Sequence, residues 1–140
     1  AWFIFLANDV HRWHFLPEPA PGIPIFGAAF VLMGYCTMLA AVLENRFAAP
    51  AVGDQSHRGQ ILIDTGPYTH IRHPLYLGLF ILLFGIGLWL QSYASVLVLP
   101  VVFTPVFGRI AVEEKALRES LPGYRDYTAR VRYRLVPYLW

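Results

Sequence analysis

Long runs without charged residues alternate with polar stretches along this chain. The first run, Ile23–Leu43, holds no Asp, Glu, Lys, Arg or His over 21 residues. As an α-helix it would be about 31 Å long, which matches the roughly 30 Å hydrocarbon core of a bilayer. Pro24 falls in the first turn, where a helix tolerates proline, and Gly27 and Gly34 would let a neighbouring helix come close. This run predicts a transmembrane helix.

Two further apolar runs, Leu75–Leu90 and Val96–Gly108, are separated by a short polar turn. Each run is short for a straight span. The pattern predicts a helical hairpin whose returning helix is kinked by Pro100 and Pro105 and continues into the charged stretch Arg109–Ser120.

These runs predict an all-α, multi-pass helical integral membrane protein with about three full spans. The apolar start, Trp2–Ala7, is interpreted as the end of a further, partial span, so we expect a fragment or a trimmed chain. A C-terminal helical segment is expected at the cytosolic face. Its Tyr124 and Tyr127 suggest an amphipathic helix on the lipid headgroups, and the arginines from Arg130 to Arg134 would attract anionic lipid.

Composition and charge agree with a membrane protein. Hydrophobic residues make up 56% of the 140 residues and charged residues only 14%, whereas soluble domains have about 25% charged residues. The net charge of +2 gives no reason to expect a nucleic-acid partner, and the single Cys36 excludes a disulfide scaffold.

The placement of Lys and Arg predicts the orientation. The expected connection on the opposite side holds only Arg12. Ten basic residues lie in the segments 44–74 and 109–140: Arg46, Arg58, Arg72, Arg109, Lys115, Arg118, Arg125, Arg130, Arg132 and Arg134. Because cytoplasmic loops carry the excess of Lys and Arg, both segments are expected at the cytosolic face, in a bacterial inner membrane.

One polar segment lies at the predicted start of the second apolar helix. Arg72 and His73 precede Pro74, a residue suited to the first helical position, and Tyr76 follows within the first turn. Free N–H groups at a helix start favour an anionic ligand. The alternative is an interfacial anchor, with these side chains snorkelling at the headgroups.

A second polar segment begins with Arg109 and Glu113, which are four residues apart and share a helix face. An ordinary surface pair would show the same spacing. A hairpin returns its chain to the side from which it entered, so this segment and Arg72–His73 must lie at the same face. The two clusters can therefore form one pocket.

The motifs that carry these residues resemble a known family. They read Gly66-Pro67-Tyr68-x-x-Ile71-Arg72-His73-Pro74-x-Tyr76-x-Gly78, then Arg109-x-x-x-Glu113-Glu114-x-x-Leu117, then Gly123-Tyr124-x-x-Tyr127. In order and spacing they resemble the isoprenylcysteine carboxyl methyltransferase family, as a bacterial-type relative in a phospholipid methyltransferase-like superfamily. The resemblance implies a helical membrane domain that binds S-adenosylmethionine at the cytosolic face and takes a lipophilic or prenylated substrate from the bilayer.

Carried over by position, the resemblance implies a set of site residues. No metal is expected, because His11 and His14 have no visible third ligand. The residues expected against the cofactor are Gln60, Ile61, Leu62, Ile63, Tyr68, His73, Pro74, Leu75, Tyr76 and Glu113. Arg109 would bind the substrate carboxylate, and Arg109 and Glu113 are the expected catalytic residues. One domain is expected over residues 1–140, with spans and a loop in 1–54 and the cofactor-binding and catalytic part in 55–137.

Three alternatives remain at this stage. A phospholipid amine N-methyltransferase would need a proton acceptor, for which a free Glu114 is the candidate. A sterol or enone reductase relative would share the Arg-His-Pro-x-Tyr-x-Gly stretch and would bind NADPH. A non-catalytic helical scaffold would bind neither cofactor. The natural acceptor and the oligomeric state are left open.

Overall fold

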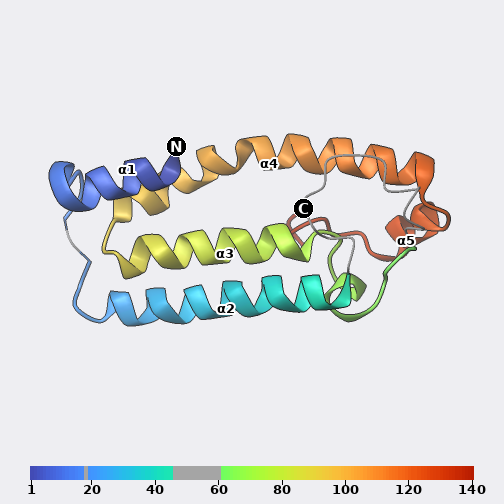
Figure 1. Cartoon of the computed structure of the whole chain (residues 1–140), viewed down its shortest axis with the longest axis horizontal. Coiled ribbons are helices and arrows are strands. Elements are labelled where there is room, and N and C mark those ends of the chain that lie inside the picture. The colour runs from blue at the N-terminus through green and yellow to red at the C-terminus, as the bar shows by residue number, and fades with distance from the viewer. Residues whose placement is uncertain (18, 46–60) are drawn as a thin grey trace. The chain divides into compact units, whose positions relative to one another are not determined.

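The computed structural model describes residues 1–17, 19–45 and 61–140, and all regular elements in these ranges are helical (Figure 1). The elements are α1 (Trp2–Asn8), a π-helical turn (Asp9–Trp13), α2 (Ile23–Glu44), a 3-10 turn (Gly66–Thr69), α3 (Pro74–Trp89), α4 (Tyr93–Ser120) and α5 (Tyr124–Arg130). The all-α expectation is confirmed for the described part of the chain.

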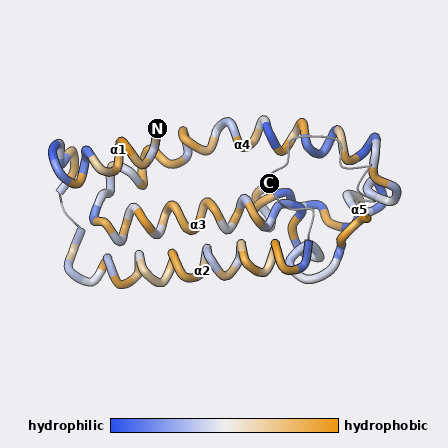
Figure 2. The backbone as a smooth tube through the Cα atoms, viewed as in Figure 1, coloured by the Kyte–Doolittle hydropathy of each residue, from blue (hydrophilic) through white to orange (hydrophobic). Residues whose placement is uncertain are grey.

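The apolar runs form the three long helices. Helix α3 begins at Pro74, as the sequence predicts, and α4 continues through Pro100 and Pro105 into the charged stretch. Helices α2 and α4 are long and apolar enough to cross a membrane, whereas α3 is apolar but has only 16 residues. Figure 2 shows apolar residues along α2 and α3 and more polar ones towards the end of α4. How many helices cross a membrane stays a prediction.

The chain divides into two compact units, which are described separately. Unit 1 comprises residues 1–36 and 78–105, and unit 2 comprises 37–77 and 106–140. Helices α2, α3 and α4 each contribute one part to either unit.

In unit 1, helices α2 and α3 meet backbone to backbone. A Cβ atom added at Gly27 would lie 2.3 Å from the Trp89 nitrogen, and one added at Gly34 would lie 2.4 Å from the Leu82 nitrogen. From the other side, a Cβ at Gly85 would lie 2.5 Å from the backbone of α2. These separations are too short for any side chain, so the expected role of Gly27 and Gly34 in close helix approach is confirmed.

A buried polar network also holds unit 1 together. Asp9 accepts a hydrogen bond from the Ser92 hydroxyl and another, at 3.0 Å, from the Phe15 amide. The indole of Trp2 donates to the Ser95 carbonyl at 3.0 Å. The carboxylate is thereby satisfied at a depth where an unpaired charge would be costly.

In unit 2, α5 packs inward. Tyr124 and Tyr127 are 4% and 2% exposed and form a cluster with Val131. Partly buried leucines cover this cluster: Leu62, Leu117 and Leu121. The expectation that these tyrosines lie on lipid headgroups is therefore wrong. An apolar helix face can pack against a protein core or lie on a membrane surface, and the sequence pattern is the same in both cases. Here the face packs against the protein core.

The C-terminal tail of unit 2 pairs with the residues before α3. The amides of Arg72 and His73 donate to the carbonyls of Tyr133 and Arg134 at 3.0 and 2.9 Å. The tail satisfies these two N–H groups and fixes the entry to α3. Whether the N–H groups inside the first turn of α3 bind an anionic ligand stays a prediction.

Candidate active site

The Tyr76 hydroxyl lies between the two residues of the second polar segment. It accepts a hydrogen bond from Arg109 Nε at 2.7 Å and donates one to Glu113 Oε2 at 3.1 Å. Tyr76 comes from the first turn of α3, while Arg109 and Glu113 lie one turn apart on α4. Arg109 makes no direct ion pair with Glu113. The phenol therefore links the two residues, so they do not form the ordinary surface pair.

The next residue on α4, Glu114, is a buried carboxylate surrounded by basic side chains. Its Oε1 lies 3.2 Å from Arg72 Nε and 3.3 Å from His73 Nε2. Its Oε2 lies 3.2 Å from Arg134 Nε and 3.6 Å from Arg118 Nη2. Glu114 is only 2% exposed. One carboxylate thus joins the start of α3, helix α4 and the C-terminal tail.

Arg72 and His73 are held by this carboxylate. They are 8% and 6% exposed, which argues against the alternative that they snorkel at headgroups. Burial lowers the pKa of the Arg72 guanidinium, and the charge of Glu114 opposes that shift. The Arg72–Glu114 pair therefore offsets part of the cost of burying a guanidinium.

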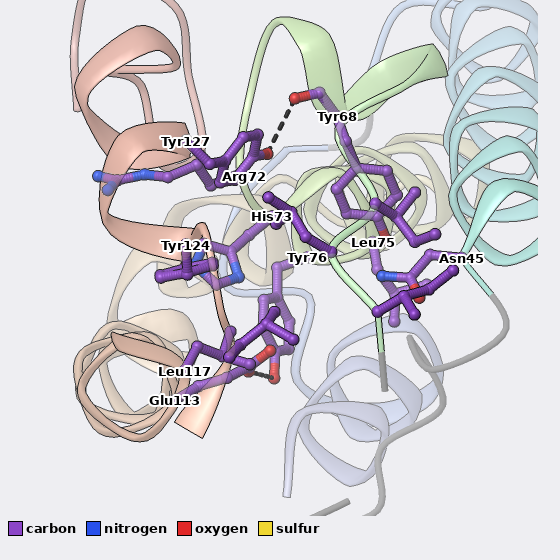
Figure 3. Close-up of a pocket in the computed structure, with 14 residues that line it drawn as sticks. Asn45, Tyr68, Arg72, His73, Leu75, Tyr76, Glu113, Leu117, Tyr124 and Tyr127 are labelled. Atoms are coloured by element: carbon purple, nitrogen blue, oxygen red, sulfur yellow. Dashed lines mark hydrogen bonds between the residues drawn. The ribbon is translucent and has the colours of Figure 1, made fainter. Parts of the chain in front are cut away.

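A pocket in unit 2 opens beside these residues (Figure 3). Its polar lining includes Arg72, His73, Tyr76 and Glu113. The remaining lining residues are Asn45, Ile61, Leu62, Ile63, Tyr68, Leu75, Leu117, Leu121, Tyr124 and Tyr127. The pocket therefore combines a carboxylate and several aromatic rings with an apolar wall, a composition that suits a ligand with both polar and apolar parts.

Three buried tyrosines fix one side of the pocket. Tyr127 donates from its hydroxyl to the Tyr68 carbonyl at 2.8 Å, the dashed line drawn between them in Figure 3. Tyr68 in turn donates to the Ala41 carbonyl of α2 at 3.4 Å. Burial raises the pKa of Tyr68, Tyr124 and Tyr127 above the ordinary value of 10.0. All three phenols are therefore uncharged at neutral pH.

The structure brings most of the predicted cofactor residues to this one pocket. Eight of them line it: Ile61, Leu62, Ile63, Tyr68, His73, Leu75, Tyr76 and Glu113. Pro74 is buried at the start of α3 and does not line the pocket. Gln60 lies outside the described residues. Arg109 does not line the pocket and contacts it through the Tyr76 hydroxyl. What each residue binds stays a prediction.

Several pocket residues were absent from the predicted cofactor set. Four of them come from the end of α4, the turn after it and α5: Leu117, Leu121, Tyr124 and Tyr127. Part of the signal was present in the sequence, because Leu117, Tyr124 and Tyr127 belong to the spaced motifs. Asn45, at the end of α2, belongs to no motif and had no signal in the sequence.

Comparison with known proteins places the chain in a family. A family model described as "Phospholipid methyltransferase" matches residues 23–122, which is more than half of the chain. The chain belongs to the phospholipid methyltransferase family. The match runs from the start of α2 to just beyond α4, so this family region contains Tyr76, Arg109 and Glu113.

Individual relatives agree with membership of the phospholipid methyltransferase family. The chain is 28% identical over 105 residues to "Protein-S-isoprenylcysteine O-methyltransferase" of Schizosaccharomyces pombe, covering 73% of the chain and 44% of that relative. The protein of the same name from Saccharomyces cerevisiae is 31% identical over 110 residues, covering 76% and 46%. The resemblance noted in the sequence is thereby confirmed.

A third relative has a different name. "Nickel-cobalt-cadmium resistance protein NccN" of Alcaligenes xylosoxydans xylosoxydans is 33% identical over 70 residues, covering 49% of the chain and 33% of the relative. This member of the phospholipid methyltransferase family spans less than half the length of these curated relatives. No solved structure matches the chain.

Proposed function

We propose that the chain transfers a methyl group from S-adenosylmethionine to the carboxylate of a lipophilic acceptor, such as a prenylated cysteine. Membership of a methyltransferase family and the names of the two yeast relatives support this proposal. The observation that carries it is the hydrogen-bonded link from Arg109 through Tyr76 to Glu113. This link would set an acceptor-binding cation beside a cofactor-binding carboxylate.

The pocket supplies suitable groups for the cofactor. Glu113 is a partly buried carboxylate that would bind the amino group or the ribose, and the rings of Tyr68 and Tyr76 would contact the remainder. S-adenosylmethionine supplies a methyl group activated by a positively charged sulfur. The pocket has a volume of about 90 Å³, room for only a few water molecules, so we expect its lining side chains to move apart when a nucleoside-sized ligand enters.

Arg109 would orient the acceptor. Its side chain is exposed, and apart from the Nε bond to Tyr76 it has no partner among the described residues. The remaining guanidinium N–H groups can therefore hold a carboxylate by paired hydrogen bonds. In the reaction one carboxylate oxygen forms a bond to the methyl carbon while the carbon–sulfur bond breaks, and the sulfur leaves as a neutral thioether. No proton moves, so alignment and exclusion of water are the main requirements.

The state of Glu114 favours a carboxylate acceptor over an amine. Methylation of a protonated amine requires a group that takes a proton. Glu114 was the candidate for this role, but both its oxygens are engaged by cations of the protein. A carboxylate in that setting is a poor base, and transfer to an oxygen anion needs none.

The helices and charges support a membrane location for this reaction. Helices α2 and α4 have the length and composition of membrane spans. Ten of the eleven basic residues lie in the two segments that contribute most of the pocket residues, 44–74 and 109–140. We therefore place the protein in a membrane, in bacteria the inner membrane, with its site at the cytosolic face, where a water-soluble cofactor and a lipid-anchored acceptor can meet.

The test combines cofactor binding with product chemistry. Purified protein is titrated calorimetrically with S-adenosylhomocysteine and then incubated with radiolabelled S-adenosylmethionine and a prenyl-cysteine analogue. We expect binding and a product whose label is released as volatile methanol by alkali, since esters hydrolyse and N-methyl groups do not. Absence of binding would refute the methyltransferase, and tight NADPH binding in its place would favour a reductase. An alkali-stable product would favour amine methylation.

A further inference from the structure

A second cavity in unit 2 lies between the end of α4, α5 and the C-terminal tail. Its volume is about 530 Å³. Its lining contains four cations and two carboxylates: Lys115, Arg118, Arg125, Arg134, Glu114 and Glu119. Apart from Glu114, none of these residues has a predicted role in methyl transfer.

The cavity has an excess of positive charge. In the described part of the chain, no carboxylate oxygen lies within 4.0 Å of the charged nitrogens of Lys115 or Arg125. No basic side chain lies that close to the carboxylate of Glu119. Among the described residues, Glu114 is the only carboxylate that pairs with cavity cations, and it is shared with Arg72 and His73, which line the first pocket instead. Two carboxylates, one of them shared in this way, therefore do not balance the four cations of the cavity.

Glu114 also separates the two cavities. Its Oε1 contacts residues of the first pocket, and its Oε2 contacts Arg118 and Arg134 of the second. A ligand in the second cavity would lie on the Oε2 side of the Glu114 carboxylate. It would not compete for the groups proposed to bind S-adenosylmethionine. The second cavity is therefore a distinct candidate site.

We propose that this basic cavity binds a phosphate group. Three guanidinium groups and one ammonium converge on it, and guanidinium forks bind phosphate oxygens in pairs while ammonium groups add charge. Lys115 and Arg118 lie on α4 beyond its apolar stretch, the position at which a lipid headgroup would lie if α4 spans a bilayer. The phosphate can belong to an anionic lipid or be free in solution, and the two sources can be distinguished.

The test uses the thermal unfolding midpoint of the purified full chain, which does not depend on methyl transfer. The protein in zwitterionic detergent is titrated with inorganic phosphate in one arm. In the other, the protein in phosphatidylcholine nanodiscs is compared with protein in nanodiscs that contain phosphatidylglycerol. Because a ligand of the folded state raises the midpoint by mass action, we expect a saturable rise in at least one arm.

Matched arginine variants localise the effect. Arg125 and Arg132 are both exposed and have no ion-pair partner in the described ranges, but only Arg125 lines the cavity. Arg125→Gln should weaken the apparent affinity about fivefold, the effect of one cation at a headgroup, and Arg132→Gln should leave it within about twofold. Lys115→Gln is a second cavity variant, should the first fail to fold, and should behave like Arg125→Gln.

Each outcome decides the proposal. A rise with inorganic phosphate shows that the group alone is recognised, whereas a rise only with phosphatidylglycerol shows that the cavity takes the phosphate of a lipid. Both support the site when the cavity variants weaken the effect and Arg132→Gln does not. No rise in either arm, or equal weakening by Arg125→Gln and Arg132→Gln, overturns it, because the attraction would then be absent or spread over the whole basic surface.

Discussion

The Arg109 Nε donates a 2.7 Å hydrogen bond to the Tyr76 hydroxyl, and this contact joins the exposed arginine to the pocket. The same hydroxyl donates to Glu113, so its two hydrogen bonds run in one direction, from the cation to the carboxylate. Charge-assisted hydrogen bonds of this kind are stronger and more directional than neutral ones. Tyr76 therefore sets the position of Arg109 relative to the carboxylate that we expect to hold the cofactor.

Removing this hydroxyl should impair transfer more than cofactor binding. Tyr76→Phe keeps the ring in the pocket but removes both hydrogen bonds. Each bond to a charged group contributes about 1.5–3 kcal/mol, so kcat/KM for the acceptor should fall by about 10- to 100-fold. Affinity for S-adenosylhomocysteine, measured by calorimetry, should change less than about threefold.

Tyr35→Phe is the matched control for that substitution, because Tyr35 is exposed on α2 and lies outside the pocket. It should leave both quantities unchanged. Equal losses of cofactor affinity and turnover in Tyr76→Phe would show that Tyr76 serves the cofactor alone.

Arg109→Ala should abolish transfer to a carboxylate acceptor while cofactor binding survives. The exposed guanidinium does not line the pocket, so its loss should leave the affinity for S-adenosylhomocysteine within about threefold, whereas the acceptor loses a charge-assisted pair. Arg132→Ala removes a comparable exposed arginine outside the pocket and should keep full activity. If Arg109→Ala lost cofactor binding together with turnover, Arg109 would belong to the cofactor site.

The sequence predicts the helices well because their signal is local. Three signals depend only on neighbours along the chain: the charge-free runs, the proline at the start of α3 and the four-residue spacing of Arg109 and Glu113. The close approach of α2 and α3 also follows from small residues, of which Gly27 and Gly34 are the decisive ones.

The partners of Glu114 could not be predicted in the same way. Arg134 follows it by 20 residues and reaches it through a tail with no regular pattern. The inward packing of Tyr124 and Tyr127 was missed for another reason, since periodicity identifies an apolar face but not what covers it. Such long-range pairings become visible only in three dimensions.

The charge of Glu114 should be essential for stability. Glu114→Gln leaves the buried Arg72 without its counter-ion, and loss of one partner of a buried pair costs about 3–5 kcal/mol in the free energy of unfolding. Glu119→Gln is the control, since this exposed carboxylate has no ion-pair partner among the described residues, and it should change stability by about 0.5 kcal/mol at most. Denaturant unfolding of both variants measures the difference, and equal midpoints would contradict the central role of Glu114.

High pH should destabilise unit 2 through its buried phenols. Burial raises the folded-state pKa of Tyr124 and Tyr127, whereas an unfolded tyrosine ionises near about pH 10. Their contribution is thus complete well below about pH 10 and is lost as the pH rises through and beyond this value, with a slope that approaches about 1.4 kcal/mol per pH unit for each phenol. Replacing Tyr124 by Phe should make the fall in the free energy of unfolding between about pH 10 and 11 less steep, by about 1 kcal/mol per pH unit. An unchanged slope would show that the phenol ionises equally in both states.

Close packing of α2 and α3 should make Gly34 intolerant of any side chain. Gly34→Ala places a methyl group 2.4 Å from the backbone of Leu82, and since backbone cannot rotate away, the two helices must separate. Overpacking of this kind costs about 1–3 kcal/mol. Gly108→Ala, also within a helix, is the matched control, because a Cβ there meets nothing within 4 Å; with alanine's higher helix propensity it should be neutral or stabilising by up to about 1 kcal/mol. Thermal unfolding in detergent compares the two, and a Gly34→Ala midpoint at or above that of Gly108→Ala would show that the helices do not need this contact.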